Sequence, residues 1–143
     1  MPIGEAIAAE AEAWIGTPFK WQGRVKAGCD CKGLVAGVAK ACGRSEGDSL
    51  FAAAGDYGFK VDARRLQSGL AALFDRVTDI APGDVLLLRI DGKPQHLAIA
   101  APVDGKPTRA IQALHTGPCK VVVGRVPRDM VHSIWRWKES DAS

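Results

Sequence analysis

The spacing of apolar residues changes near residue 74, and this change constrains the fold more than any other feature of the 143-residue chain. Before that point apolar residues recur at helical spacing. They predict helices over 3–15, over 31–42, and from an N-cap at Asp62 through Leu73. Residues 44–60 between them are irregular, with glycine and aspartate punctuation. The first half of the chain is therefore expected to be helical.

Beyond residue 74 the apolar runs are typical of strands. Strands are expected over 85–90, 95–101, 108–116, 120–126 and 134–138. The sequence Asp-Gly-Lys-Pro occurs at 91–94 and at 104–107, each time between two such runs, which predicts hairpin turns. Asp84, in a Pro-Gly-Asp turn, is expected to be a turn former. The result is an α+β fold in a single domain over 1–143, helical over about 3–74 and sheet over about 76–138.

Composition excludes several classes of function. Apolar residues make up 47 % and charged residues 24 %, and the net charge of +3 is dispersed, which gives no reason to expect a nucleic-acid partner. No apolar run approaches the roughly 18 residues that span a membrane. The N-terminal segment lacks the basic and apolar regions of a signal peptide, which predicts synthesis in the cytoplasm without the general secretory route.

Four cysteines remain to be explained, and Cys31 has the most informative position. It falls where the second helix begins, and the unpaired N–H groups and dipole of a helix N-terminus stabilise a thiolate. Asp30 before it is an N-cap candidate, and Gly33 after it permits close approach of another backbone or a substrate. The sequence therefore offers Cys31 as a candidate nucleophile.

A cysteine nucleophile needs a base and a group that orients the base. His96 opens one expected strand, and His115 lies near the end of the next. On adjacent antiparallel strands these ends can lie side by side, where a helix N-terminus would bring Cys31 to them. Nothing around His132 suggests chemistry.

Simpler roles exist for the same residues. Cys31 could be a buried structural thiol, and Cys42 and Cys119 are expected to be core or loop thiols. A further alternative is a zinc site in which Cys29 and Cys31 are joined by Cys42, Cys119 or His96. Cys-x-Cys is not the usual Cys-x₂-Cys spacing, and the sequence has no second pair. Cys29 could also act as a resolving thiol that protects Cys31. The tryptophans are expected to pack against other side chains: Trp14, Trp21, Trp135 and Trp137.

Four motifs in order carry a family resemblance. They are Gly-Thr-Pro-Phe at 16–19, Asp-Cys-x-Gly-Leu-Val at 30–35, Pro-Gly-Asp-Val-Leu at 82–86 and His-Leu-Ala-Ile at 96–99. Together they resemble the NlpC and p-sixty family of papain-like cysteine peptidases, which cut bacterial cell-wall peptides, over about 5–137. The longer motif Gly-Cys-Asp-Cys-x-Gly-Leu-Val and the Trp-rich ending look most like the branch found in phage tails and gene-transfer agents.

The resemblance implies that Cys31 is the nucleophile and His96 the base. The third catalytic residue is either His115 or Gln112, since both stand in a pattern like that of the family. Residues three apart on one strand point to opposite faces, so only one can face His96, and His115 is preferred.

The expected substrate-binding residues are Trp21, Gln22 and Asp30. Trp21 would form an aromatic wall of the cleft. Many family members have Tyr at the position of Phe19, so here the N–H of Cys31 with another donor, of which Gln22 is one candidate, must bind the oxyanion.

The expected function is hydrolysis of an amide bond in peptidoglycan stem peptides, next to D-glutamate, by a cysteine endopeptidase that needs no cofactor. The branch resemblance implies phage-like tail proteins as partners and action at the cell wall as part of such a particle. No nucleic-acid or membrane partner is expected. The alternative is a non-catalytic tail or wall-binding module on the same fold.

Overall fold

The computed structural model describes residues 2–53, 62–101 and 109–139. The helices are α1 (Ile3–Glu12), α2 (Cys31–Ala41), α3 (Glu46–Ala53) and α4 (Ala63–Leu73), with a 3-10 turn η1 (Arg128–Met130). The strands are β1 (Arg24–Val25), β2 (Gly28–Cys29), β3 (Asp75–Val77), β4 (Val85–Ile90), β5 (Lys93–Ala100), β6 (Arg109–Ala113), β7 (Val121–Arg125) and β8 (Val131–Arg136). The expected second hairpin turn at 104–107 lies outside the described residues.

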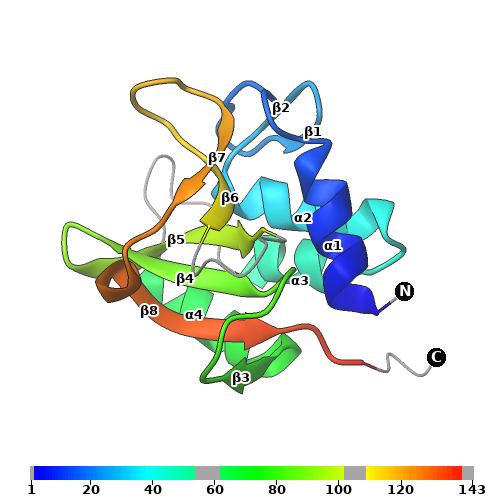
Figure 1. Cartoon of the computed structure of the whole chain (residues 1–143), viewed down its shortest axis with the longest axis vertical. Helices are drawn as coiled ribbons and strands as arrows, with labels where there is room; N and C mark the ends of the chain where they lie inside the picture. Colours follow the sequence, from blue (N-terminus) through cyan, green and yellow to red (C-terminus); the bar gives the residue numbers. More distant parts are fainter. Residues whose placement is uncertain (1, 54–61, 102–108, 140–143) are drawn as a thin grey trace.

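The main sheet has six antiparallel strands in the order β3–β8–β4–β5–β6–β7, and β1 and β2 form a small separate hairpin (Figure 1). Helix α2 packs on β5 and β6, and α1 and α3 pack on α2. The helical half therefore lies against the sheet half, and the expected α+β class with N-terminal helices and a C-terminal antiparallel sheet is confirmed.

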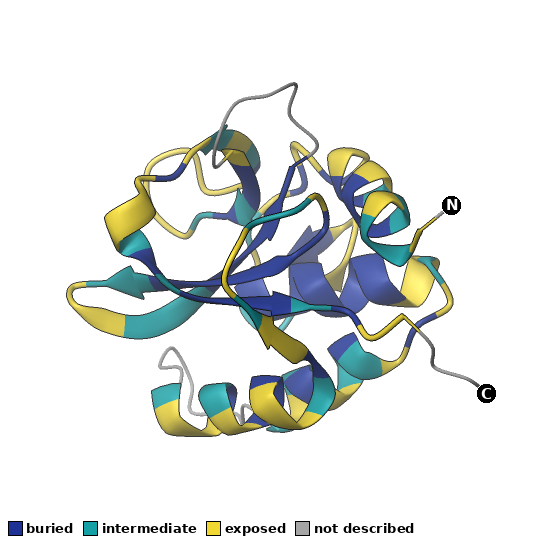
Figure 2. Cartoon of the chain, turned by 60° about the horizontal axis from the view of Figure 1, so that its bottom comes forward, coloured by how far each residue is buried: buried dark blue, intermediate teal, exposed yellow. Residues whose placement is uncertain are grey.

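Two apolar clusters hold these layers together. The first lies between the helices and the sheet and combines residues of both, including Leu34, Leu66, Leu97 and Ile111. The second, which includes Leu86, Leu88 and Val131, contains residues from the strands and their loops alone. Alternate residues of β4 belong to different clusters, so the two clusters lie on opposite faces of the sheet. Helix α2 is buried over most of its length (Figure 2).

Three helices lie where the sequence predicts them. The cap of α4 is confirmed, since the Oδ1 of Asp62 accepts the N–H of Arg65 at 3.1 Å. The hairpin at 91–94 is confirmed as well, because Asp91 and Gly92 have φ of 53° and 78°, as a two-residue primed turn requires. Helix α3 was not predicted: the irregular structure expected for residues 44–60 is wrong for Glu46–Ala53, which is helical.

None of the helices in the described ranges combines the length and the apolar character that crossing a membrane would demand.

Candidate active site

Asp30 fixes the start of α2. Its Oδ1 accepts the N–H of Gly33 at 2.7 Å, and its Oδ2 accepts the N–H of Gln22 at 2.9 Å. Gln22 has a left-handed φ of 66°, so the loop turns sharply where the carboxylate holds it. Asp30 is only 2 % exposed, and both its oxygens are engaged by backbone. The structure thus places this expected substrate-binding residue as the N-cap that joins the loop to the helix.

Glycines let the same loop lie directly on α2. A Cβ at Gly33 would overlap the carbonyl oxygen of Gly23, and one at Gly37 would overlap the ring of Trp14. The first two turns of α2 are therefore covered at van der Waals contact by the loop and by Trp14, which follows α1. Cys31 is consequently held on a rigid support.

Cys31 is the first residue of α2 and is 8 % exposed. It shares the first apolar cluster with Leu97, and the backbone N–H of Leu97 is placed to stabilise its thiolate. Leu97 directly follows His96 in β5. The thiol therefore lies against the strand segment that carries the expected base.

The electrostatic surroundings of Cys31 differ from the expectation of a stabilised thiolate. Burial, reinforced by the negative charge of Asp30, raises the pKa of the Cys31 thiol to about 11. The N–H of Leu97, the charge of Lys32 and the N–H of Lys32 lower the pKa and offset part of this rise. The effects that raise the pKa outweigh those that lower it, so the neutral thiol is favoured in the resting protein.

Gln112 is the side chain hydrogen-bonded to His96. The distance from His96 Nε2 to Gln112 Oε1 is 3.0 Å, and because an amide oxygen only accepts, Nε2 carries the proton. The Nδ1 of the neutral ring is then free to accept a proton. Burial lowers the pKa of His96, while the bond to Gln112 partly opposes this shift.

His115 lies elsewhere, which corrects the preference for it as the partner of His96. Strand β6 ends at Ala113, so His115 is in the following turn and is exposed. Its ring packs 4.9 Å from the ring of Trp21 and 5.2 Å from that of Phe19. Phe19 and Trp21 also meet edge to face at 4.9 Å. These three rings form a cluster in the loops before α2 and after β6.

Two contributions to the site were missed by sequence reasoning. Lys32 is buried at 3 % exposure, with its ammonium 5.3 Å from the centre of the Phe51 ring, and its charge acts on Cys31. The backbone N–H of Leu97 acts on the same thiol. The sequence does show that Lys32 directly follows the candidate nucleophile, so this contribution could have been predicted. The contribution of the Leu97 N–H could not, because a backbone donor has no signature in the sequence.

The remaining cysteines occupy the expected kinds of position. Cys42 is partly buried beside the core, and Cys119 is exposed in a loop. Cys29 is buried, and burial together with the charges of Asp30 and Cys31 raises its pKa to about 12. Within the described residues, no three His, Cys, Asp or Glu side chains are grouped so as to hold a metal ion.

The expected packing of the tryptophans is confirmed. Trp14, Trp135 and Trp137 are at most 6 % exposed and belong to the first apolar cluster. Trp21 lies in the loop that leads to Cys31 and packs on Phe19 and His115.

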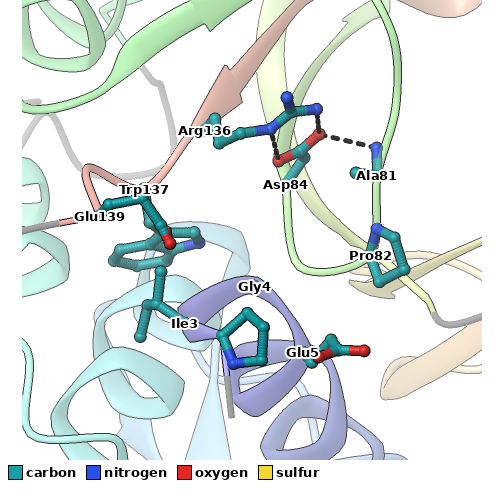
Figure 3. A pocket seen from close by; sticks show the side chains of 10 residues that line it. Ile3, Gly4, Glu5, Ala81, Pro82, Asp84, Arg136, Trp137 and Glu139 are labelled. Carbon is teal, nitrogen blue, oxygen red and sulfur yellow. Dashed lines mark hydrogen bonds and ion pairs between the residues drawn. The ribbon is translucent and has the colours of Figure 1, made fainter.

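Asp84 has the structural role that its turn predicts. Its carboxylate forms a pair of hydrogen bonds with Arg136, at 3.0 and 2.8 Å, and also accepts the N–H of Ala81 (Figure 3). This ion pair borders a hollow of about 420 Å³ between the N-terminal end of α1 and the segment after β8. Neither Cys31 nor His96 lines that hollow.

The fold and site together define a papain-like arrangement, with a cysteine at a helix N-terminus against a strand that carries a histidine. Residues 16–133 match the model of the NlpC/P60 family, and the chain therefore belongs to this family.

Solved structures agree with this assignment. The NlpC/p60 domain of the peptidoglycan hydrolase SagA is 29 % identical, with a TM-score of 0.61, over 92 % of this chain and 97 % of that one. An NLP/P60 protein of Staphylococcus aureus, described as similar to lipoprotein, is 17 % identical with a TM-score of 0.63, and covers 96 % of this chain. An NlpC/P60 protein of Bacillus cereus is 18 % identical with a TM-score of 0.61, over 95 % of this chain.

This chain spans 42 % of the length of the Staphylococcus aureus protein and 40 % of the Bacillus cereus protein, which share the fold with it. A comparison with curated protein sequences gives no significant match.

Proposed function

We propose that this protein is a cysteine peptidase that hydrolyses an amide bond in the peptide part of peptidoglycan. The observation that carries the proposal is the placement of Cys31 at the start of α2, against the β5 segment whose His96 is held by Gln112. Membership of the NlpC/P60 family and the likeness to a peptidoglycan hydrolase domain support the substrate class.

In the proposed mechanism, His96 acts as base and then as acid. As the Cys31 sulfur attacks the carbonyl carbon, its proton passes to Nδ1 of His96, and Nε2 keeps its bond to Gln112. The oxyanion accepts the N–H of Cys31, one of the unpaired donors of the first turn of α2. The C–N bond then breaks, and Nδ1 returns the proton to the leaving amine.

Water completes the cycle. It attacks the thioester carbonyl while Nδ1 of His96 takes one of its protons. The carbon–sulfur bond breaks, the peptide leaves as a carboxylic acid, and the proton on His96 returns to the Cys31 sulfur.

The pKa values decide when the proton moves. A thiol with a pKa of about 11 is ionised in only about one molecule in 10⁴ at pH 7. The nucleophile is therefore generated by proton transfer to His96 during attack, not stored as a thiolate. Because burial lowers the pKa of His96, its neutral base form persists below the usual 6.5, and activity should extend to mildly acidic pH.

We also propose the finer features of this function. The bond cleaved is the one after D-glutamate, next to a diamino acid, as is usual in the family that the motifs resemble. The enzyme is carried to the wall by a phage-like tail, since Gly-Cys-Asp-Cys-x-Gly-Leu-Val at 28–35 resembles that branch. Trp21 and Gln22 line the route to Cys31, which the packing of Phe19, Trp21 and His115 supports.

Mass spectrometry of purified peptidoglycan fragments tests the proposal. The wild-type chain should release products shortened at one amide bond, and Cys31→Ala should release none. Cys42→Ala serves as the matched control and should cleave normally, since Cys42 lies at the far end of α2. Equal cleavage by Cys31→Ala would refute the mechanism.

A non-catalytic wall-binding module is the second candidate, and the raised pKa of Cys31 is the observation that favours it. In that case wild type and Cys31→Ala would both sediment with insoluble peptidoglycan and neither would cleave it.

A further inference from the structure

A small hollow on the β3 side of the sheet has a lining rich in hydrogen-bond donors. It has a volume of about 180 Å³ and is bordered by Arg76 in β3, Thr78 after it, Arg128 in η1, and His132 and Ser133 in β8. None of these residues belongs to the site around Cys31 and His96. The edge position of β3 in the sheet can be followed in Figure 1.

The backbone brings His132 to this hollow through an irregularity in β8. Ser133 pairs with Leu87, whereas the next residue of β4, Leu88, pairs with Val131. His132 is thus the extra residue of a β-bulge, a feature that redirects a side chain away from the regular alternation of a strand.

A short chain of hydrogen bonds positions the ring of His132. The indole N–H of Trp135 can only donate, so the Ser133 Oγ accepts it, at 2.9 Å. The same Ser133 Oγ lies 2.9 Å from Nδ1 of His132, so the imidazole is anchored at that nitrogen. With Nδ1 engaged by the Ser133 hydroxyl, Nε2 is the ring nitrogen left for a ligand, and it is a donor whenever it carries a proton.

The hollow is electropositive. Arg76 and Arg128 line it, and no acidic residue does. Within the described ranges, no ion pair involves either arginine. Burial, then the charges of Arg89 and Arg76, lower the pKa of His132, which indicates that positive charge acts on this position.

Arg89 adds rigidity as well as charge. Its guanidinium donates to the carbonyl oxygens of Asp129 and Val131, at 3.0 and 3.3 Å. These bonds connect β4 to the turn that carries Arg128 and to the residue before His132, so the donors of the hollow are held in place.

We propose that this hollow binds a phosphate group, either as the free ion or as a phosphodiester. Arg76, Arg128, His132 and Thr78 line it from three separate segments, and their side chains can supply guanidinium, imidazole and hydroxyl donors. Donors arranged around a hollow match the tetrahedral set of phosphate oxygens better than the planar pair of a carboxylate, and guanidinium binds phosphate strongly. The volume of the hollow equals that of about six water molecules in the liquid, which is enough for one phosphate group.

The binding of inorganic phosphate, glycerophosphoglycerol and acetate to the whole chain tests the proposal. Phosphate titrations should shift the ring NMR signals of His132 in a saturable manner, and acetate at equal concentration should not displace phosphate. Binding of both phosphates identifies the phosphate group itself as the ligand, and binding of glycerophosphoglycerol alone identifies a diester.

Arg128→Gln and Arg76→Gln should each weaken binding about tenfold or more, because each removes a charged donor. The matched control is Arg125→Gln, an exposed arginine of β7 at the opposite edge of the sheet, which should bind as the wild type does. Equal affinity of Arg128→Gln and the control, or equal binding of acetate, would overturn the proposal. Peptide cleavage is not part of this test, so its result is independent of the proposed function.

Discussion

At the scale of single residues, the candidate site depends on which side chain holds His96. Gln112 lies within β6 and reaches Nε2 at 3.0 Å, whereas His115 is two residues past the end of that strand. Both residues match the same sequence pattern, but β6 ends at Ala113, so only Gln112 lies on the strand beside His96. The role once expected of His115 is therefore proposed for Gln112.

Replacing Gln112 by Leu should lower kcat by about ten- to a hundredfold. The buried Nε2–H of His96 would lose its acceptor, and the imidazole ring would no longer be held in its orientation. Steady-state kinetics on a defined wall peptide would measure this. Gln112→Glu keeps an acceptor and should raise the pKa of His96, which would move the acid limb of the pH profile upward.

His115→Ala is the matched control for that experiment. It removes a ring that packs on Trp21 and Phe19, so it should change KM and leave the pH profile as it is. A larger fall in kcat for His115→Ala than for Gln112→Leu would return the orienting role to His115.

The pKa of Cys31 gives a second prediction at this scale. With a pKa raised to about 11, the thiolate forms only as the pH rises, so alkylation of Cys31 by iodoacetamide should still be accelerating above pH 9. At pH 7 the exposed Cys119 should be labelled before Cys31. Peptide mapping by mass spectrometry at several pH values would measure both rates, and a Cys31 rate that is already constant at pH 7 would show a stabilised thiolate.

At the scale of elements, the start of α2 is built on close backbone contact. The cap by Asp30 and the absence of a side chain at Gly33 allow the loop at Gly23 to lie on the helix. The cap and the helix were readable from the sequence, because they follow from neighbouring residues. The contact of the helix with the loop at Gly23 was not readable from the sequence, because it depends on how the loop packs in the folded chain.

Gly33→Ala should destabilise the protein by about 1–3 kcal/mol, because the new Cβ overlaps the carbonyl oxygen of Gly23 and one backbone must move. Urea unfolding would measure the loss, and activity should fall with it as Cys31 shifts. In Gly124→Ala the Cβ meets nothing within 4 Å, so this control should change stability by less than about 1 kcal/mol. Equal stability of the two variants would contradict the described packing.

Helix α3 shows why some elements escape prediction. Its Gly47 is needed for close approach to the backbone of Ala36, and its Leu50 enters the shared core. Both residues pack on other parts of the fold, and the polar residues around them carry no clear helical period. Tertiary contact, more than local preference, makes this segment helical.

At the scale of the whole molecule, a partly buried ion pair connects the turn before β4 to the last strand. Asp84 precedes β4 and is 1 % exposed, and Arg136 ends β8. The two bonds between them, with the bond from Trp137 Nε1 to Gly83 O at 2.8 Å, hold the turn against the last strand.

Asp84→Ala should lower the free energy of unfolding by about 1–3 kcal/mol, because the N–H of Ala81 and the guanidinium of Arg136 lose their acceptor. The loss should be about half of the roughly 3–5 kcal/mol typical of breaking a fully buried pair, since Arg136 keeps contact with solvent. Thermal unfolding would measure the change. Asp75→Ala breaks the exposed pair with Lys138 and should change stability by about 0–1 kcal/mol, and a comparable loss in both variants would contradict the special role of Asp84.

The sequence by itself determined the helical half, the antiparallel half, the caps at Asp30 and Asp62, and the candidates Cys31 and His96, because these follow from local spacing and from motifs. Only the tertiary structure decided that Gln112 holds His96, that Asp30 is engaged by backbone on both oxygens, and that Cys31 is favoured as a neutral thiol. Strand ends, solvent exclusion and contacts between distant segments arise from the packing of the whole chain, and they set the hydrogen bonds and pKa values on which chemistry depends.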